Sequence, residues 1–331
     1  MATRKGRYRI NVVTQTQPGN WSGGFAKAVC SGLEDRGYTV TQVEVFGLPK
    51  ESVQDSLKSS PQADLWYVIR SDDWSIPMLL GMGEKVATHS HGGVETGQFC
   101  DVMMGARTPD QSQLYRDLEF VTINSVAHQQ AIRKHYGDKA ADKAKIIGFP
   151  MDFSRFDVAT APKTLIAVTG RFAHEKQLPL LAKALEPFSD RVVFATGESA
   201  DSPEGGKSQK VKMAVYLQRL GYAVLMECRG STYEDLLARS KVVVTAGGWD
   251  TLNLSVIEGI ASGASPVAPR MAPYTEYLED GMYDPFSISD IREKVRHALT
   301  APHSWHKVKQ YDMDCVLSKL MDCFEEKSNG N

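Results

Sequence analysis

The sequence predicts an α/β protein of two doubly wound domains, each built around a parallel β-sheet. The chain has 331 residues, about twice the length of a common single domain. Short apolar runs alternate with amphipathic stretches, and this rhythm restarts once, near residues 151–163. Strands that alternate with helices of such length form right-handed βαβ units, and these units build parallel sheets.

The first half of the chain has the pattern of one such domain. Strands are expected at 8–13, 39–45, 65–69, 85–88, 120–124 and 145–147. Apolar residues at helical spacing predict helices at 25–36 and 125–136. Gly37 follows the first of these helices, and glycine is a common residue just after a helix end.

The second half repeats the alternation. Strands are expected at 164–169, 191–195, 223–226, 241–245 and 266–268. Helices are expected at 178–185, 210–220, 232–240 and 254–261. Thr232 opens the third of these helices, and threonine is a favourable capping residue there.

Composition and charge exclude several classes of protein. The formal net charge is -2 and 42% of the residues are hydrophobic, which is ordinary for a packed globular chain. The five cysteines have no CxxC spacing, so neither a disulfide framework nor a zinc site is expected. No apolar run approaches the roughly 20 residues of a membrane span, and the apolar stretch near the amino end is too short for a signal peptide. We therefore expect a cytoplasmic protein.

Ligands of doubly wound sheets bind beyond the carboxyl ends of the strands, so we expect a site in a cleft between the two domains. The loop after the first strand leads to Gly23 and Gly24 at the start of a helix. Glycines there let backbone N–H groups approach a phosphate or a sugar. The spacing is not GxGxxG, which argues against a dinucleotide fingerprint.

Two further segments follow strands of the second half. In 168–176, Arg171 and Lys176 leave a strand end, where two cations can hold a diphosphate and neutralise the charge on a leaving nucleotide. In 246–267, Asp250 ends a loop, and Glu258 lies on the next helix among apolar neighbours. The amides that start this helix, at Asn253, Leu254 and Ser255, can bind a phosphate.

Together these segments resemble the retaining GT-B glycosyltransferases of family GT4, the glycosyltransferase group 1 family. The sequence has TGR-x4-K at 169–176 and D-x7-E at 250–258, followed by GIASGASPV. Segment 125–156 is similar to the family's linker region, and the likeness extends to Trp305 and the terminal helix. The resemblance implies two facing Rossmann-like domains. These are an acceptor-side domain at 1–158 and a nucleotide-sugar-binding domain at 159–304, with a helix at 305–331 that crosses back to the first.

The resemblance also implies roles for the residues. Arg171 and Lys176 would contact the diphosphate of the donor, and Glu258 would bind the ribose. Asp250 would hold hydroxyls of the transferred sugar, although the family usually has glutamate there. One methylene fewer shortens the reach by about 1.5 Å, which leaves the donor sugar open. Gly23 and Gly24 match the family's amino-terminal glycine loop.

A histidine near a strand end of the first domain is also expected from the resemblance. Both His89 and His91 are present, and His91, which precedes Gly92, matches better. An imidazole near the reacting carbon could orient the donor or stabilise charge. Weaker candidates for the acceptor side are Glu95, Trp21 and Trp74. Such enzymes generally need no metal ion, so no obligatory cofactor is expected beyond a nucleotide-sugar donor, with UDP-sugars such as UDP-glucose favoured.

The predicted function is transfer of a hexose to an acceptor hydroxyl with retention. The acceptor stays open between a small molecule, a glycan, a protein and a hydroxymethyl-pyrimidine in phage DNA. Basic residues at 4–9 and 133–145 could touch DNA phosphates. Two other classes remain, a sugar-nucleotide epimerase and a non-catalytic nucleotide-sugar binder. The sequence does not indicate an oligomeric state.

Overall fold

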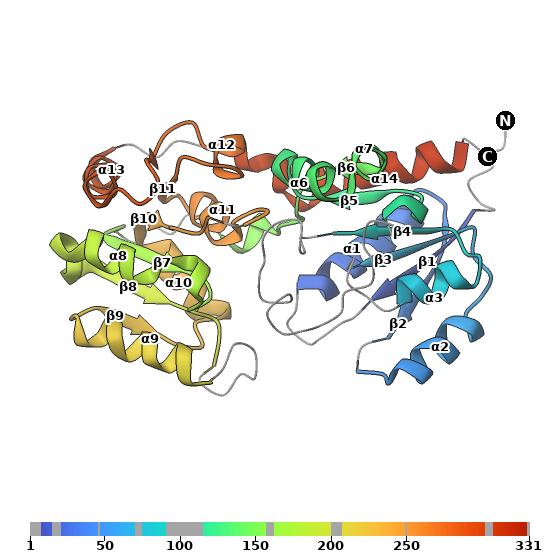
Figure 1. Cartoon of the computed structure of the whole chain (residues 1–331), viewed down its shortest axis with the longest axis horizontal. Coiled ribbons are helices and arrows are strands. Elements are labelled where there is room, and N and C mark those ends of the chain that lie inside the picture. The colour runs from blue at the N-terminus through green and yellow to red at the C-terminus, as the bar shows by residue number, and fades with distance from the viewer. Residues whose placement is uncertain are drawn as a thin grey trace. The chain divides into compact units, whose positions relative to one another are not determined.

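The computed structural model describes residues 8–14, 21–45, 47–69, 75–90, 115–156, 162–199, 207–248, 250–301 and 307–329. The chain divides into two compact units. The first unit comprises Met1–Met151 together with Tyr311–Asn331, and the second comprises Asp152–Gln310. The C-terminal helix therefore belongs to the same unit as the N-terminal half of the chain (Figure 1).

The first unit contains a six-stranded parallel sheet of order β2-β1-β3-β4-β5-β6. Its strands are β1 (Arg9–Thr14), β2 (Thr39–Glu44), β3 (Leu65–Ile69), β4 (Val86–His89), β5 (Val121–Ile123) and β6 (Ala144–Ile146). Its helices include α1 (Trp21–Asp35), α2 (Lys50–Ser59), α3 (Ser75–Gly81), α6 (Val126–Tyr136), α7 (Asp138–Asp142) and α14 (Met313–Asn329).

Helices cover both faces of this first sheet. Phe25 of α1 and Phe324 of α14 pack on one face, in a cluster that includes Tyr67 of β3. Leu57 of α2 and Ile132 of α6 belong to the cluster on the other face. Strands covered on both faces are continuously apolar, as the fully buried β3 (LWYVI) is.

The second unit contains a parallel sheet of order β12-β11-β10-β7-β8-β9. Its strands are β7 (Leu165–Thr169), β8 (Val192–Ala195), β9 (Ala223–Leu225), β10 (Ser240–Val244), β11 (Ser265–Pro269) and β12 (Met282–Tyr283). Its α-helices include α8 (Leu178–Leu185), α9 (Lys207–Arg219), α10 (Gly230–Arg239), α11 (Leu254–Ala261), α12 (Tyr274–Tyr277) and α13 (Ile288–Thr300). The 3-10 turns are η3 (Phe153–Arg155), η4 (His174–Lys176) and η5 (Glu186–Arg191), with η6 (Lys307–Tyr311) at the junction to the first unit.

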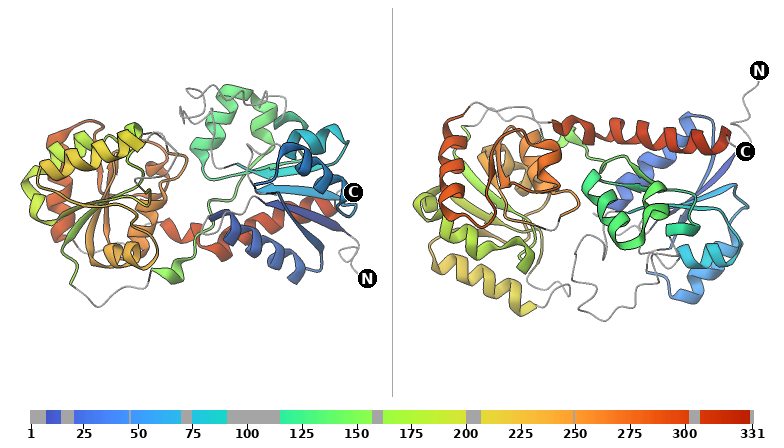
Figure 2. Two further views of the ribbon diagram at one scale, coloured as in Figure 1. Left: turned by 90° about the horizontal axis from the view of Figure 1, so that it is seen from below. Right: turned by 45° about the horizontal axis from the view of Figure 1, so that its top comes forward.

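The second sheet is also covered on both faces (Figure 2). One apolar cluster joins it to α8, α9 and α13, through residues such as Leu181 and Val295. A second cluster joins its other face to α10, through Leu237. Helix α11 packs very close to β10, because a Cβ atom on Gly259 would lie only 2.4 Å from Cγ1 of Val243.

The predicted fold class is therefore confirmed as α/β with two doubly wound parallel sheets. One boundary differs in a way that bears on function. Helix α1 begins at Trp21 rather than at residue 25, so Gly23 and Gly24 lie within its first turn. The first four N–H groups of a helix have no partner inside the helix, so both glycines still belong to the part of α1 that can bind an anion. Helices α2, α3, α7, α12 and α13 and strand β12 were not predicted. No helix in the described ranges is long and apolar enough to cross a membrane.

Candidate functional site

Strand order places the candidate site at the carboxyl edge of the second sheet. Strands β7 and β10 are neighbours there, although β8 and β9 lie between them in the chain. Helix α8 follows β7 on one face of the sheet, and α11, which follows β10, contributes Ala261 to the apolar cluster on the other. The loops that follow the two strands therefore diverge at this point, which is where doubly wound sheets bind their ligands.

Lys176 and Asp250 meet at this edge. Lys176 Nζ lies 2.6 Å from Asp250 Oδ1, and both side chains are mostly buried, with 14% and 15% of their surface exposed. The two residues are 74 positions apart, one in the turn after β7 and one in the loop after β10. Asn253 Nδ2 donates a hydrogen bond of 2.8 Å to the other carboxylate oxygen, Asp250 Oδ2. Both oxygens of Asp250 are thus held by nitrogen donors.

Asn253 also begins helix α11. Its Oδ1 accepts a hydrogen bond of 3.2 Å from the backbone N–H of Val256, which makes it the capping residue. Leu254 and Ser255 form the first turn of this helix and are partly exposed. Their backbone N–H groups lie in the part of a helix that favours negative charge. The helix start, Lys176 and Asp250 therefore lie within one small region.

A side chain at position 247 would displace the carboxylate of Asp250. A Cβ atom there would lie 2.5 Å from Asp250 Oδ2 and 3.4 Å from Lys176 Nζ. The hydroxyl of the buried Tyr274 donates a hydrogen bond of 2.7 Å to the carbonyl oxygen of Gly247. It also lies 3.3 Å from Asp250 Oδ2. Sequence reasoning missed Tyr274, which begins the short helix α12.

Glu258 forms a second polar cluster on α11. The hydroxyl of Tyr233, on α10, donates a hydrogen bond of 2.5 Å to Glu258 Oε2. Burial raises the pKa of Glu258 to about 7, while the hydrogen bond from Tyr233 and the positive charge of Arg155 lower it. Burial, followed by the charge of Glu258, raises the pKa of Tyr233 well above its usual value, so this hydroxyl remains a donor. Arg155 itself pairs with Glu234 at 2.7 Å.

Arg171 differs from Lys176 in its surroundings. Its side chain is about half exposed, and its Nη2 lies 2.8 Å from Oε1 of Glu175. The sequence predicted two cations directed at one diphosphate. The structure places Arg171 in an exposed pair within its own turn and Lys176 in a buried pair with Asp250.

A third carboxylate lies nearby, and sequence reasoning also missed it. Glu198 follows β8, the strand beside β7, and its Oε2 accepts a hydrogen bond of 3.1 Å from the backbone N–H of Phe172. Its Oε1 lies 2.7 Å from Nζ of Lys210, whose side chain is 4% exposed. This buried pair ties α9 to the turn that carries Arg171. A carboxylate directly after a predicted strand was the signal that could have identified it.

Several predicted residues of the first unit lie outside the described residues or are only partly described. His91, Glu95 and Trp74 lie outside them, and Trp21 lies in α1 without a described side chain. Gly24 is exposed, with open space where a side chain would project. The alternative histidine, His89, is fully buried at the end of β4, where its Nδ1 lies 3.0 Å from the hydroxyl of Thr122.

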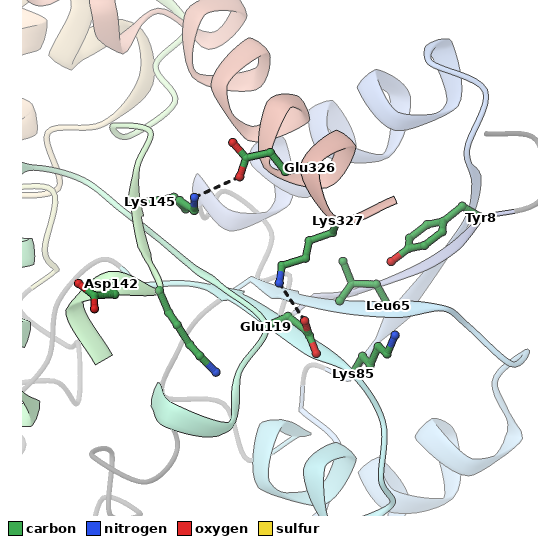
Figure 3. Close-up of a pocket in the computed structure, with 9 residues that line it drawn as sticks. Tyr8, Leu65, Lys85, Glu119, Asp142, Lys145, Glu326 and Lys327 are labelled. Atoms are coloured by element: carbon green, nitrogen blue, oxygen red, sulfur yellow. Dashed lines mark hydrogen bonds and ion pairs between the residues drawn. The ribbon is translucent and has the colours of Figure 1, made fainter. Parts of the chain in front are cut away.

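A charged cavity of about 460 Å³ lies in the first unit, at the edge of its sheet where the strands begin (Figure 3). Lys327 of α14 points toward Glu119 at 3.0 Å, and Lys145 toward Glu326 at 3.1 Å. The carboxyl ends of the strands lie away from this cavity, because Leu65 in its wall is the first residue of β3. Among the described residues, no group of three or more histidine, cysteine, aspartate or glutamate side chains could hold a metal ion.

The sequence matches no protein-family model, and a search of curated proteins finds no significant match. Solved structures are similar over the whole chain. Sucrose-phosphate synthase from Thermosynechococcus elongatus has a TM-score of 0.74 at 12% identity, covering 98% of this chain and 100% of that one. Anabaena HepE in complex with UDP and glucose has a TM-score of 0.71 at 14% identity, covering 96% and 99%. A glycosyltransferase from Rickettsia africae has a TM-score of 0.67 at 14% identity, covering 96% and 98%. The chain thus has the GT-B fold of glycosyltransferases.

Proposed function

We propose that this protein is a glycosyltransferase that transfers a hexose from a nucleoside-diphosphate sugar to an acceptor hydroxyl, with retention. One observation carries the proposal. An ammonium group (Lys176) and a carboxylate (Asp250) pair beside the start of α11, where the loops after the neighbouring strands β7 and β10 meet, and a second carboxylate (Glu258) lies further along the same helix. These are the groups needed to bind a diphosphate, a sugar and a ribose at one place.

In this proposal the diphosphate lies between Lys176 and the first turn of α11, with Arg171 added from its exposed turn. An ammonium group has three N–H donors, so Lys176 can contact the diphosphate while it keeps its hydrogen bond to Asp250. Positive groups at this position stabilise the charge that grows on the nucleoside diphosphate as the sugar leaves. Mutual pairing of Lys176 and Asp250 before the donor arrives limits the cost of holding two charges in a mostly buried site.

The two carboxylates divide the donor's hydroxyl groups between them. Asp250 accepts hydrogen bonds from hydroxyls of the transferred sugar, and Glu258 accepts from the ribose. With a pKa of about 7, Glu258 changes its charge near neutral pH. The ionised form is the better acceptor for two hydroxyls, so donor affinity should increase as the pH rises through this value.

With retention, the acceptor oxygen bonds to the anomeric carbon on the face from which the phosphate oxygen departs. The acceptor proton passes to the departing phosphate oxygen, and the site supplies positive charge rather than a covalent nucleophile. We place His91, Gly23 and Gly24 at this reaction from the first unit, on the strength of the family resemblance, with Glu95, Trp21 and Trp74 as weaker candidates on the acceptor side. UDP is the favoured nucleotide because HepE, a structural neighbour, is seen with UDP and with UDP-glucose.

Among acceptors, a small molecule, a glycan or a protein fits better than DNA. Two cations of the basic segment at 133–145 pair with carboxylates in the structure, and a third donates to a backbone carbonyl. Arg133 pairs with Asp138 at 3.1 Å, and Lys145 pairs with Glu326 at 3.1 Å. Lys143 donates to the backbone carbonyl of Leu118 at 2.6 Å. A steep loss of acceptor binding with increasing salt would favour DNA instead.

The identity of the donor is tested by measuring the melting temperature of the protein with each of a panel of nucleotide sugars. A ligand that binds only the folded state raises the melting temperature. We expect stabilisation by UDP-glucose or another UDP-sugar, with a GDP-sugar second, and we expect it to persist in EDTA. Turnover of the sugar to an epimer without acceptor would favour an epimerase. Binding without transfer to any acceptor would favour a non-catalytic binder.

A double variant identifies the site. Arg171→Ala with Lys176→Ala should abolish the stabilisation by the donor. The matched control is Lys183→Ala with Arg191→Ala, an exposed lysine and arginine of the same unit that are located before β8, at the other end of the strand. If both double variants respond to the donor as the wild type does, the assignment of the diphosphate site is wrong.

A further inference from the structure

The residue of interest is Tyr274, which belongs to none of the motifs. It is fully buried, and it lies 24 positions after Asp250, at the start of α12. Its hydroxyl lies 2.7 Å from the carbonyl oxygen of Gly247, 3.1 Å from Asn253 Nδ2 and 3.3 Å from Asp250 Oδ2. Burial, followed by the charge of Asp250, raises the pKa of this phenol well above its usual value, so it keeps its proton.

The hydroxyl of Tyr274 donates its one hydrogen bond to the carbonyl oxygen of Gly247. A phenol donates one hydrogen bond and can accept others. The shorter contact, 2.7 Å, goes to the carbonyl oxygen of Gly247, while the oxygen of Tyr274 accepts from the amide of Asn253 at 3.1 Å. Tyr274 therefore fixes the two neighbours of Asp250 rather than supplying its main hydrogen bond.

Those two neighbours determine where the carboxylate of Asp250 lies. Asn253 donates to Oδ2 at 2.8 Å. The backbone of Gly247 leaves so little room that a Cβ atom would come within 2.5 Å of the same oxygen. Lys176, at 2.6 Å from Oδ1, completes the set of groups that hold this carboxylate in place.

We propose that Tyr274 is a positioning residue for the sugar subsite: it holds Gly247 and Asn253 so that the carboxylate of Asp250 can accept hydrogen bonds from hydroxyls of the transferred sugar. The inference rests on the proposed function. It separates two parts of donor binding. The diphosphate depends on Lys176 and the start of α11, whereas the sugar depends on Asp250 and therefore on Tyr274.

The test compares a donor with the same nucleotide lacking its sugar. Isothermal titration calorimetry measures the Kd of UDP-glucose and of UDP for the wild type and for Tyr274→Phe, or of GDP-mannose and GDP if that pair stabilises the wild type better. We expect Tyr274→Phe to raise the Kd of the nucleotide sugar about tenfold, because a misplaced Asp250 carboxylate would lose one hydrogen bond from a hydroxyl of the sugar. The Kd of the diphosphate should stay within about twofold of the wild-type value.

The chain provides a closely matched control. The buried hydroxyl of Tyr283 donates a hydrogen bond of 2.8 Å to the carbonyl oxygen of Thr245, two residues before Gly247. Tyr283→Phe removes the same kind of bond from the same loop, but it leaves in place the hydroxyl of Thr245, whose Oγ1 lies 3.2 Å from both Gly247 N and Asn253 Nδ2. It should change stability as Tyr274→Phe does, yet leave both dissociation constants near the wild-type values. Asp250→Asn tests the sugar subsite directly. It should weaken the binding of the nucleotide sugar but not that of the nucleoside diphosphate.

Each outcome decides the matter. Equal weakening of both ligands by Tyr274→Phe, or the same selective loss in Tyr283→Phe, would show that Tyr274 has only a structural role. Unchanged binding of the sugar donor by both Tyr274→Phe and Asp250→Asn would remove Asp250 from the sugar subsite. If the wild type binds neither member of either pair, the proposed function itself fails, and this inference fails with it.

Discussion

Glu258 should make the stability of the second unit depend on pH in a direction opposite to that of most carboxylates. Burial raises its pKa from the usual 4.5 to about 7. Between these two values the folded state holds a proton that the unfolded state releases. Stability therefore falls as the pH rises through this interval and is flat above it. At about 1.4 kcal/mol for each pH unit, the loss amounts to about 3 kcal/mol between pH 4.5 and pH 7.

The measurement is urea unfolding of the wild type and of Glu258→Gln over this pH range. Glutamine has a similar shape and no charge, so the difference between the two unfolding free energies isolates the titration of Glu258. Tyr233→Phe sharpens the test, because the hydrogen bond from Tyr233 lowers the pKa of Glu258. Without that bond the decline should continue above pH 7. A difference that does not vary with pH would show that Glu258 titrates like a solvated carboxyl, and the argument from burial would be wrong.

Two further predictions concern close packing in the second unit. Gly259→Ala should destabilise the protein by about 1–3 kcal/mol, because its Cβ would lie 2.4 Å from Cγ1 of Val243. In a Val243→Ala background the same change should cost less, and equal costs in urea unfolding would contradict the steric explanation. Lys210→Met should cost roughly 3 kcal/mol, because it leaves the mostly buried Glu198, 16% exposed, without its cation. The matched change of an exposed lysine, Lys183→Met, should stay within about 1 kcal/mol, and a similarly small effect of Lys210→Met would show that the buried pair contributes little.

The alternation of apolar runs was sufficient to predict the strands, because a parallel sheet covered on both faces needs continuous apolar segments. The same reasoning failed for helices whose apolar residues are few. Helix α2 (KESVQDSLKS) buries only Val53 and Leu57. Helix α13 was missed although its signal was present. Ser287 accepts a hydrogen bond from the backbone N–H of Asp290, and buried residues such as Ile291 and Val295 follow at helical spacing.

The site was predictable where residues follow strands and unpredictable where distant segments add to them. Lys176 and Asp250 could be placed at a carboxyl edge from local pattern, but their contact depends on β7 and β10 being neighbours. Strand order is a property of the whole sheet, and it is not encoded in either segment alone. Tyr233 and Tyr274 reach the site from α10 and α12, which belong to no motif.

The clusters around Asp250 and Glu258 need residues from outside the motifs for the same physical reason. Charged groups placed in a mostly buried site need partners before any ligand arrives, because an unpaired buried charge is costly. The motif segments supply the charges and, for Asp250, its direct partners Lys176 and Asn253. Residues outside the motifs add Tyr233 beside Glu258 and Tyr274 beside Asn253. Tyr233 donates to Glu258, and Asn253, held by Tyr274, donates to Asp250. The partner residues then determine how firmly each carboxylate is held. Both carboxylate oxygens of Asp250 are therefore held before any donor binds.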